Sequence, residues 1–200
     1  MHKPAQTGFP LNALIADRWS PLAFSDRPVE REKLGSLMEA VRWSSSCYNE
    51  QPWYFIVANK QDNADHFDQL LSCIVEANQT WAKDAPILML AIAQTVFSRN
   101  GKPNRHGIYD LGQSVATMIL QAESMGLVAH QMGGFDPDRA REIYQVPPDC
   151  EIMAAIALGY QGNLSTLPPN LQERESSDRV RKNLDSFVFS EQWGKTLPLS

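Results

Sequence analysis

The sequence of 200 residues contains few cysteines and no long apolar run, and each shortage excludes a class of protein. Three cysteines stand at wide, irregular spacing without a C-x-x-C pair, which argues against a disulfide framework and a zinc site. The most apolar stretch, PILMLAIA, has the length of a strand and is too short to span a membrane. Residues 1–20 contain no apolar core typical of a signal peptide. We therefore expect a soluble protein of the reducing cytoplasm.

The common catalytic signatures are also missing. No G-x-S-x-G, G-x-G-x-x-G or G-x-x-x-x-G-K-[ST] motif occurs, so the serine elbow of hydrolases and the usual dinucleotide and phosphate loops have no support. The four histidines show no metal-ligand spacing, and we expect no metal site. A net charge of −5 argues against nonspecific binding to nucleic acid or to acidic membranes.

The composition and the hydrophobic pattern predict one globular domain over residues 1–200. Hydrophobic residues make up 43% and charged residues 20%, and no linker or repeat divides the chain. Apolar runs that read as buried strands alternate with segments of helical periodicity, which predicts an α+β (mixed α/β) fold with helices on both sides of a sheet. The expected strands are 53–58, 86–95, 127–132 and 151–160. The expected helices are 10–17, 29–43, 62–76, 110–126 and 136–146.

The segment from Asp110 to Gly126 gives the strongest helical signal in the chain. Leu111, Val115, Met118, Ala122 and Met125 recur at spacings of four, three, four and three residues. We expect Asp110 to cap the start of this helix and Gly126 to end it.

The C-terminal segment 163–200 is polar and contains proline, but it ends in the apolar groups FVF and QWG. It has too few apolar residues to fold alone, and exposed apolar groups of this kind usually mark a contact. We therefore expect it to wrap over a partner subunit. The basic loop 98–107 reads as an exposed, solvated loop, or as a segment that meets a nucleotide phosphate.

Basic residues and glycines at the ends of predicted elements suggest the binding of an anionic, flat ligand. Arg18 and Ser20 stand near a helix end, and Arg179 and Arg181 alternate so that an extended backbone points both the same way. Paired guanidinium N–H groups match phosphate oxygens, although solvated surface arginines are the other interpretation. The segment MGG at 132–134 allows close approach of backbone to a flat ligand, or forms a simple tight turn.

The stretch SSSCYNEQPW at 44–53 is longer than a helix-to-strand connection needs. It belongs to a series of motifs, in order RWS with a nearby phenylalanine, RWSSSCYNEQPWYFIV, an asparagine ahead of DAPILML, YDLGQSVATMILQAESMGLVAHQMGGF, and RVRKNL. Together these motifs, which cover nearly the whole chain, resemble the nitroreductase family of FMN-dependent oxidoreductases. The element N-x-Q-P-W-x-F is the most specific of them.

The resemblance implies a set of residues that hold FMN at the interface of a homodimer. For the phosphate and ribityl end, they are Arg18, Trp19 and Ser20, with Arg179 and Arg181 completing the phosphate grip. For the flavin ring, they are Asn78 at the pyrimidine edge, Met132, Gly133 and Gly134 along the ring, and Ser45, Ser46, Cys47 and Asn49 from the other subunit.

The resemblance further implies a central mixed sheet flanked by helices, a C-terminal extension that embraces the partner, and a ping-pong hydride reaction. In that reaction NAD(P)H is the donor, and nitroaromatics, quinones or similar electron-poor compounds are the acceptors. No protein side chain is expected to be catalytic, because the cofactor carries the chemistry.

Leu22 and Trp81 depart from the family pattern, since many members carry basic residues at these two places. This departure supports a second hypothesis, a flavin-binding protein without efficient turnover that serves storage, sensing or flavin breakdown. A third hypothesis is an α/β interaction module that binds no flavin.

Overall fold

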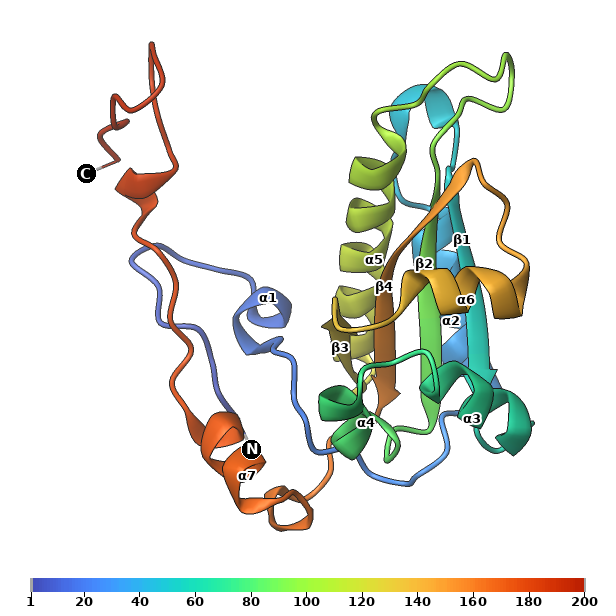
Figure 1. The fold of residues 1–200 in the computed structure, drawn as a ribbon. Coiled ribbons are helices and arrows are strands. Elements are labelled where there is room, and N and C mark those ends of the chain that lie inside the picture. Colours follow the sequence, from blue (N-terminus) through green and yellow to red (C-terminus); the bar gives the residue numbers. More distant parts are fainter. Residues whose placement is uncertain (1, 200) are drawn as a thin grey trace.

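A computed structural model describes residues 2–199 of the chain, and its centre is a sheet of four strands in the order β1-β2-β4-β3 (Figure 1). The strands are β1 (Trp53–Asn59), β2 (Ile87–Gln94), β3 (Val128–Met132) and β4 (Cys150–Gly159). All four predicted strands and the α+β class are confirmed. Mixed strand directions were expected, but every neighbouring pair in the described chain is antiparallel. In each pair, the end of one strand lies beside the start of the other, so the two run in opposite directions. For example, Lys60 N–H, just past the end of β1, donates to the carbonyl of Pro86, just before the start of β2.

Strand β2 is the centre of the hydrophobic core because helices cover both faces of the sheet. Its residues Ile87 to Ala93 are all buried. Alternate side chains face two separate clusters: Met89 packs with α2 (Arg31–Arg42) and α5 (Gly107–Ser124), whereas Leu90 packs with the cluster that contains residues of α3 (Ala64–Leu71), α4 (Glu76–Ala82) and α6 (Pro137–Tyr144). This two-sided burial explains the continuous apolar run in the sequence.

The strongest predicted helix, α5, is confirmed, but its start differs from the prediction. Leu111, Val115 and Met118 are buried along one face as expected. The helix begins at Gly107, where a Cβ would lie 2.2 Å from the carbonyl oxygen of Gln94, so only glycine allows this packing. Asp110 is therefore not the N-cap, and its carboxylate lies inside the first turn.

Two further expectations need correction. The predicted helix 62–76 ends early: α3 stops at Leu71, and a second helix, α4, which was not predicted, begins at Glu76. Between them Val75 N–H donates to the carbonyl of Gly134, which takes the chain out of a helical path. Strand β1 is not fully buried; it is an edge strand of the described sheet, and Tyr54 is 51% exposed.

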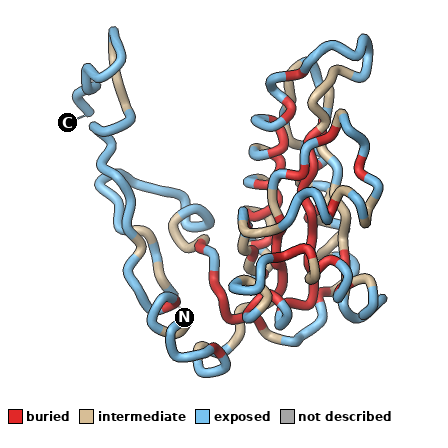
Figure 2. Tube along the Cα trace, in the orientation of Figure 1, coloured by how far each residue is buried: buried red, intermediate tan, exposed pale blue. Residues whose placement is uncertain are grey.

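The two ends of the chain form an arm beside the sheet domain (Figure 1). The arm contains the N-terminal residues, α1 (Ala13–Asp17), η2 (Leu164–Thr166), α7 (Pro169–Ser176) and η3 (Leu184–Ser186). It is exposed over most of its length (Figure 2), and its Trp193 is 92% exposed. No helix in residues 2–199 combines the length and apolar character needed to cross a membrane.

Tyr160, just past β4, links the beginning of α2 to the end of α5. Its hydroxyl donates to Glu30 Oε2 at 2.5 Å and accepts from Lys33 Nζ at 2.8 Å, and the same ammonium donates to the carbonyl of Met125 at 2.9 Å. The hydrogen bond from Tyr160, aided by one from Arg27, lowers the pKa of Glu30 from its ordinary 4.5 to about 2.

The lowered pKa of Glu30 predicts a pH-dependent contribution to stability. A group whose pKa is lower in the folded chain stabilises the fold above its unfolded pKa of about 4.5, and this contribution is lost as the pH falls toward about 2. Glu30→Gln should therefore lower the melting temperature at neutral pH and match the wild type near pH 2, measured by circular dichroism. Glu32→Gln, an exposed acid on the same helix, is the control. A difference in melting temperature between the wild type and Glu30→Gln that is the same at both pH values would contradict this account.

Candidate functional site

Three arginines from the two ends of the chain, Arg18, Arg179 and Arg181, lie together where the arm meets the sheet domain. Arg179 Nη2 donates to the carbonyl of Arg18 at 2.9 Å, and its Nη1 donates to the carbonyl of Ala16 at 2.7 Å. Burial, and then the charges of Arg179 and Arg181, lower the pKa of Arg18, while Glu123 opposes this shift. The cluster therefore carries a positive charge that a bound anion would stabilise.

The neighbours of this cluster show which side chains are available to a ligand. Ser20 and Arg181 are exposed. Trp19 is only 9% exposed, and Lys3 Nζ lies 4.9 Å from its ring. Both Nη atoms of Arg179 donate to backbone carbonyls, including that of Lys3. Of the residues predicted for the phosphate end, Arg18 and Ser20 thus offer their polar atoms, as does Arg181 apart from Nη1, which donates to the carbonyl of Val180 at 2.8 Å. Trp19 and Arg179 instead pack against or bind the surrounding chain.

A second group of predicted residues meets at the end of β3. Asn78 Nδ2 donates to the carbonyl of Gly134 at 3.3 Å. A Cβ on Gly134 would lie 2.6 Å from that Nδ2 and 2.9 Å from Val75 Cγ2, so a larger residue would displace these two side chains. A Cβ on Gly133 would meet no atom within 4 Å, which leaves open space beside this backbone. Met132 is 3% exposed and its side chain belongs to the core.

The serine-rich loop is held by two side chains of α5. Asp110 Oδ2 accepts from Cys47 N–H at 3.0 Å, and Gln113 Nε2 donates to Ser45 Oγ at 2.6 Å and to its carbonyl at 2.7 Å. Within the loop, Ser46 Oγ accepts from Gln51 N–H at 3.0 Å. Sequence reasoning missed both α5 residues as contacts of the loop; their signal was two polar residues three positions apart on a mostly apolar helix.

The same loop contains backbone that is costly for L-amino acids. Tyr48, Asn49 and Gln51 have φ of 56°, 57° and 53°, in the left-handed region. Asparagine tolerates this conformation, but for the other two it costs of order 1 kcal/mol or more each. The contacts from α5 therefore hold the loop in one shape.

The three groups of predicted residues belong to different parts of a single chain, whose elements Figure 1 shows. The serine-rich loop, with η1 (Cys47–Asn49), lies where β2 ends and α5 begins; Glu50 accepts a hydrogen bond there from Ser98 N–H. The arginine cluster follows α1 and α7, and the Asn78–Gly134 pair lies between α4 and the end of β3. One chain therefore does not bring all the predicted residues together.

The two positions that depart from the expected pattern are filled by core residues. Leu22 is 2% and Trp81 is 1% exposed. The Trp81 ring lies 4.5 Å from the His130 ring and 6.2 Å from that of Phe24, so it belongs to a buried aromatic stack. Burial lowers the pKa of His130, which keeps this imidazole neutral at neutral pH. Neither position contributes a cation.

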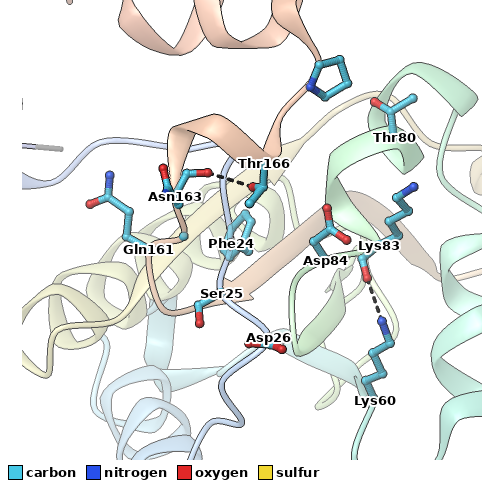
Figure 3. Close-up of a pocket in the computed structure, with 12 residues that line it drawn as sticks. Phe24, Ser25, Asp26, Lys60, Thr80, Lys83, Asp84, Gln161, Asn163 and Thr166 are labelled. Atoms are coloured by element: carbon cyan, nitrogen blue, oxygen red, sulfur yellow. Dashed lines mark hydrogen bonds between the residues drawn. The ribbon is translucent and has the colours of Figure 1, made fainter.

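A cavity of about 730 Å³ lies between the backbone at 24–26, the end of α4 and residues 161–168 (Figure 3). Both acidic and basic side chains line it, and Lys60 Nζ donates to the carbonyl of Lys83 at its rim. None of the predicted site residues lines this cavity. The cavity is therefore separate from the arginine cluster, none of whose residues lines it.

The model of the nitroreductase family matches residues 15–160, which is most of the chain and contains the Asn78–Gly134 pair, the serine-rich loop and Arg18. The chain belongs to the nitroreductase family. The resemblance predicted from the sequence is confirmed.

Three known proteins are similar to this chain over much of its length. The crystal structure of an oxidoreductase containing FMN is 33% identical, covers 96% of both chains, and has a TM-score of 0.87. An uncharacterized 15.4 kDa protein of Mycolicibacterium smegmatis is 31% identical over 68% of this chain and 90% of its own. The FMN reductase [NAD(P)H] of Bacillus subtilis is 22% identical over 87% of this chain and 75% of its own.

Asp110 is expected to control the order of the serine-rich loop of this nitroreductase-family chain. Asp110→Ala should speed hydrogen exchange of the Cys47 amide by about tenfold or more, because a hydrogen bond to a charged group contributes about 1.5–3 kcal/mol. Exchange is measured by NMR. Asp65→Ala is the matched control, since Asp65 also lies in the first turn of a helix but is exposed. An unchanged Cys47 exchange rate in Asp110→Ala would contradict the proposed support.

Proposed function

We propose that this protein is an FMN-dependent oxidoreductase that takes electrons from NAD(P)H and reduces nitroaromatics, quinones or similar electron-poor compounds. The observation that carries the proposal is the arginine cluster around Arg18. The similarity to an oxidoreductase containing FMN, at 33% identity over 96% of the chain, supports it.

The residues at hand fit FMN. The cluster offers guanidinium N–H groups of Arg18 and Arg181, with the Ser20 hydroxyl nearby in sequence, and such groups match a phosphate dianion. The open space beside Gly133 leaves room for a flat ring. Asn78 donates through Nδ2 to protein, so its Oδ1 is available to accept from a pyrimidine N–H.

We propose that the second half of each site comes from a partner subunit in a homodimer. The serine-rich loop lies near the end of β2 and the start of α5, whereas the arginine cluster follows α1 and α7 of the arm, which Figure 1 shows beside the sheet domain. A symmetric dimer places the same loop of each chain at the site of the other. In this proposal residues 1–200 are one domain, and 163–200 are the extension that embraces the partner.

When bound, FMN supplies the two-electron chemistry that side chains lack. The chain binds and orients; we propose that donor and acceptor occupy the same open site in turn, in a ping-pong cycle. We also propose a cytoplasmic location, which the three free cysteines support.

A second candidate function is flavin binding without efficient turnover. The observation that favours it is the burial of Leu22 and Trp81 beside a neutral His130. A cation near the ring would stabilise the anionic reduced state, so its absence there favours a low reduction potential.

The visible spectrum of the purified protein distinguishes these functions. With added FMN we expect a bound-flavin spectrum that bleaches when NADPH or NADH is added without oxygen and returns when a quinone is supplied. A flavin that binds but does not bleach would favour the second candidate. No spectral change with FMN would contradict both.

Removal of the end of the arm tests the dimer separately from the arginine cluster. A chain cut after Lys182 keeps all three arginines but loses the exposed apolar residues Phe187 and Trp193. We expect it to be monomeric by light scattering, and to bind FMN at least tenfold more weakly because the partner's loop is lost. A truncated chain that is still dimeric would rule out the embracing role of the tail.

A further inference from the structure

Glu175 is the one buried residue of α7, and its side chain is a carboxylate. It is 3% exposed, whereas its neighbours Glu173 and Arg174 are exposed. Its Oε2 accepts from the N–H of Leu22 at 2.8 Å, and its Oε1 is 3.5 Å from the N–H of Ala23. No salt bridge to Glu175 is found among residues 2–199.

The buried carboxylate and the two backbone amides stabilise each other. A buried carboxylate is unfavourable unless it is hydrogen-bonded, and the two amides are not satisfied by a helix or strand. Each group therefore satisfies the other. A carboxylate that accepts backbone N–H groups forms stronger hydrogen bonds than a neutral acceptor does.

The contact is one of two between the same pair of chain segments. Glu175 binds the amide of Leu22, and four residues later Arg179 donates to the carbonyl of Arg18, four residues before Leu22. The two segments thus run antiparallel and are joined by hydrogen bonds at both ends. Arg181 follows directly, so its position relative to Arg18 depends on both contacts.

The stretch 18–23 is also held from the sheet side. His130 Nδ1 lies 2.9 Å from the carbonyl oxygen of Pro21, and because a carbonyl oxygen can only accept, Nδ1 is the donor. Since β3 holds this stretch on one side, the position of the arm against its other side depends on the contacts of Glu175 and Arg179.

We propose that Glu175 is a positioning residue: by docking α7 on the amides of residues 22 and 23, it sets the spacing of the arginines that hold the FMN phosphate. The inference rests on the proposed function. Glu175 itself does not touch the ligand, and it is absent from the residues that the sequence indicated.

The experiment compares Glu175→Gln with Glu173→Gln, the same change two residues away on an exposed position of α7. Apoprotein is titrated with FMN and with riboflavin, which lacks the phosphate, and flavin fluorescence is followed. Glu175→Gln should weaken FMN binding about tenfold, since one charged acceptor is lost. Riboflavin affinity should stay within twofold of the wild type, and Glu173→Gln should change neither.

Equal FMN affinity in both variants would overturn the inference and leave the proposed function intact. An equal loss for FMN and riboflavin would also overturn it, because a general structural defect does not depend on the phosphate. Wild-type protein that binds no FMN would overturn the proposed function, and this inference with it.

A measurement on the wild type covers the case in which Glu175→Gln does not fold. Coupling between two sites is reciprocal, so phosphate binding must strengthen the docking of α7. FMN, but not riboflavin, should slow hydrogen exchange of the Leu22 amide. Equal exchange with both ligands would contradict the role of Glu175.

Discussion

Backbone groups at and beyond the last turn of a helix need hydrogen-bond partners. At the end of α1 and in the stretch that follows it, residues 16–23, side chains supply several of them. Arg179 donates to two of the carbonyls, His130 contacts a third, and Glu175 accepts from the amides. These side chains come from the tail, from an edge strand of the sheet and from α7. The stretch is therefore the place where both ends of the chain meet the sheet domain, and the cationic cluster exists only because they meet.

The serine-rich loop, a further group of residues proposed to bind FMN, is also held by side-chain hydrogen bonds, at another place in the fold. The serine-rich loop holds three residues in left-handed backbone, and Asp110 and Gln113 of α5 fix it through its amides and carbonyls. Both halves thus have a defined shape within one chain, although they lie apart. In the proposed homodimer, two surfaces that are already ordered would come together, which would lower the entropic cost of forming the site.

The sequence predicted the elements with continuous apolar patterns well. Strand β2 and the buried face of α5 follow from periodicity alone, because burial on both faces or on one stripe dictates residue type. It did not predict the break between α3 and α4, which depends on a distant contact with Gly134. The arginine cluster followed from motif order, but Glu175 lies in a polar helix whose sequence gives no sign that one carboxylate is buried.

The central claim is that each site is completed by the partner chain, and complementation between two defective chains tests it most directly. Arg18→Ala and the exposed Ser45→Glu are made separately and then co-expressed with different tags, so that mixed dimers are purified. If the site is shared, each mixed dimer has one intact site, and FMN should bind with wild-type affinity at half the wild-type stoichiometry. Mixed dimers that bind FMN as weakly as either parent would show that each site lies within one chain.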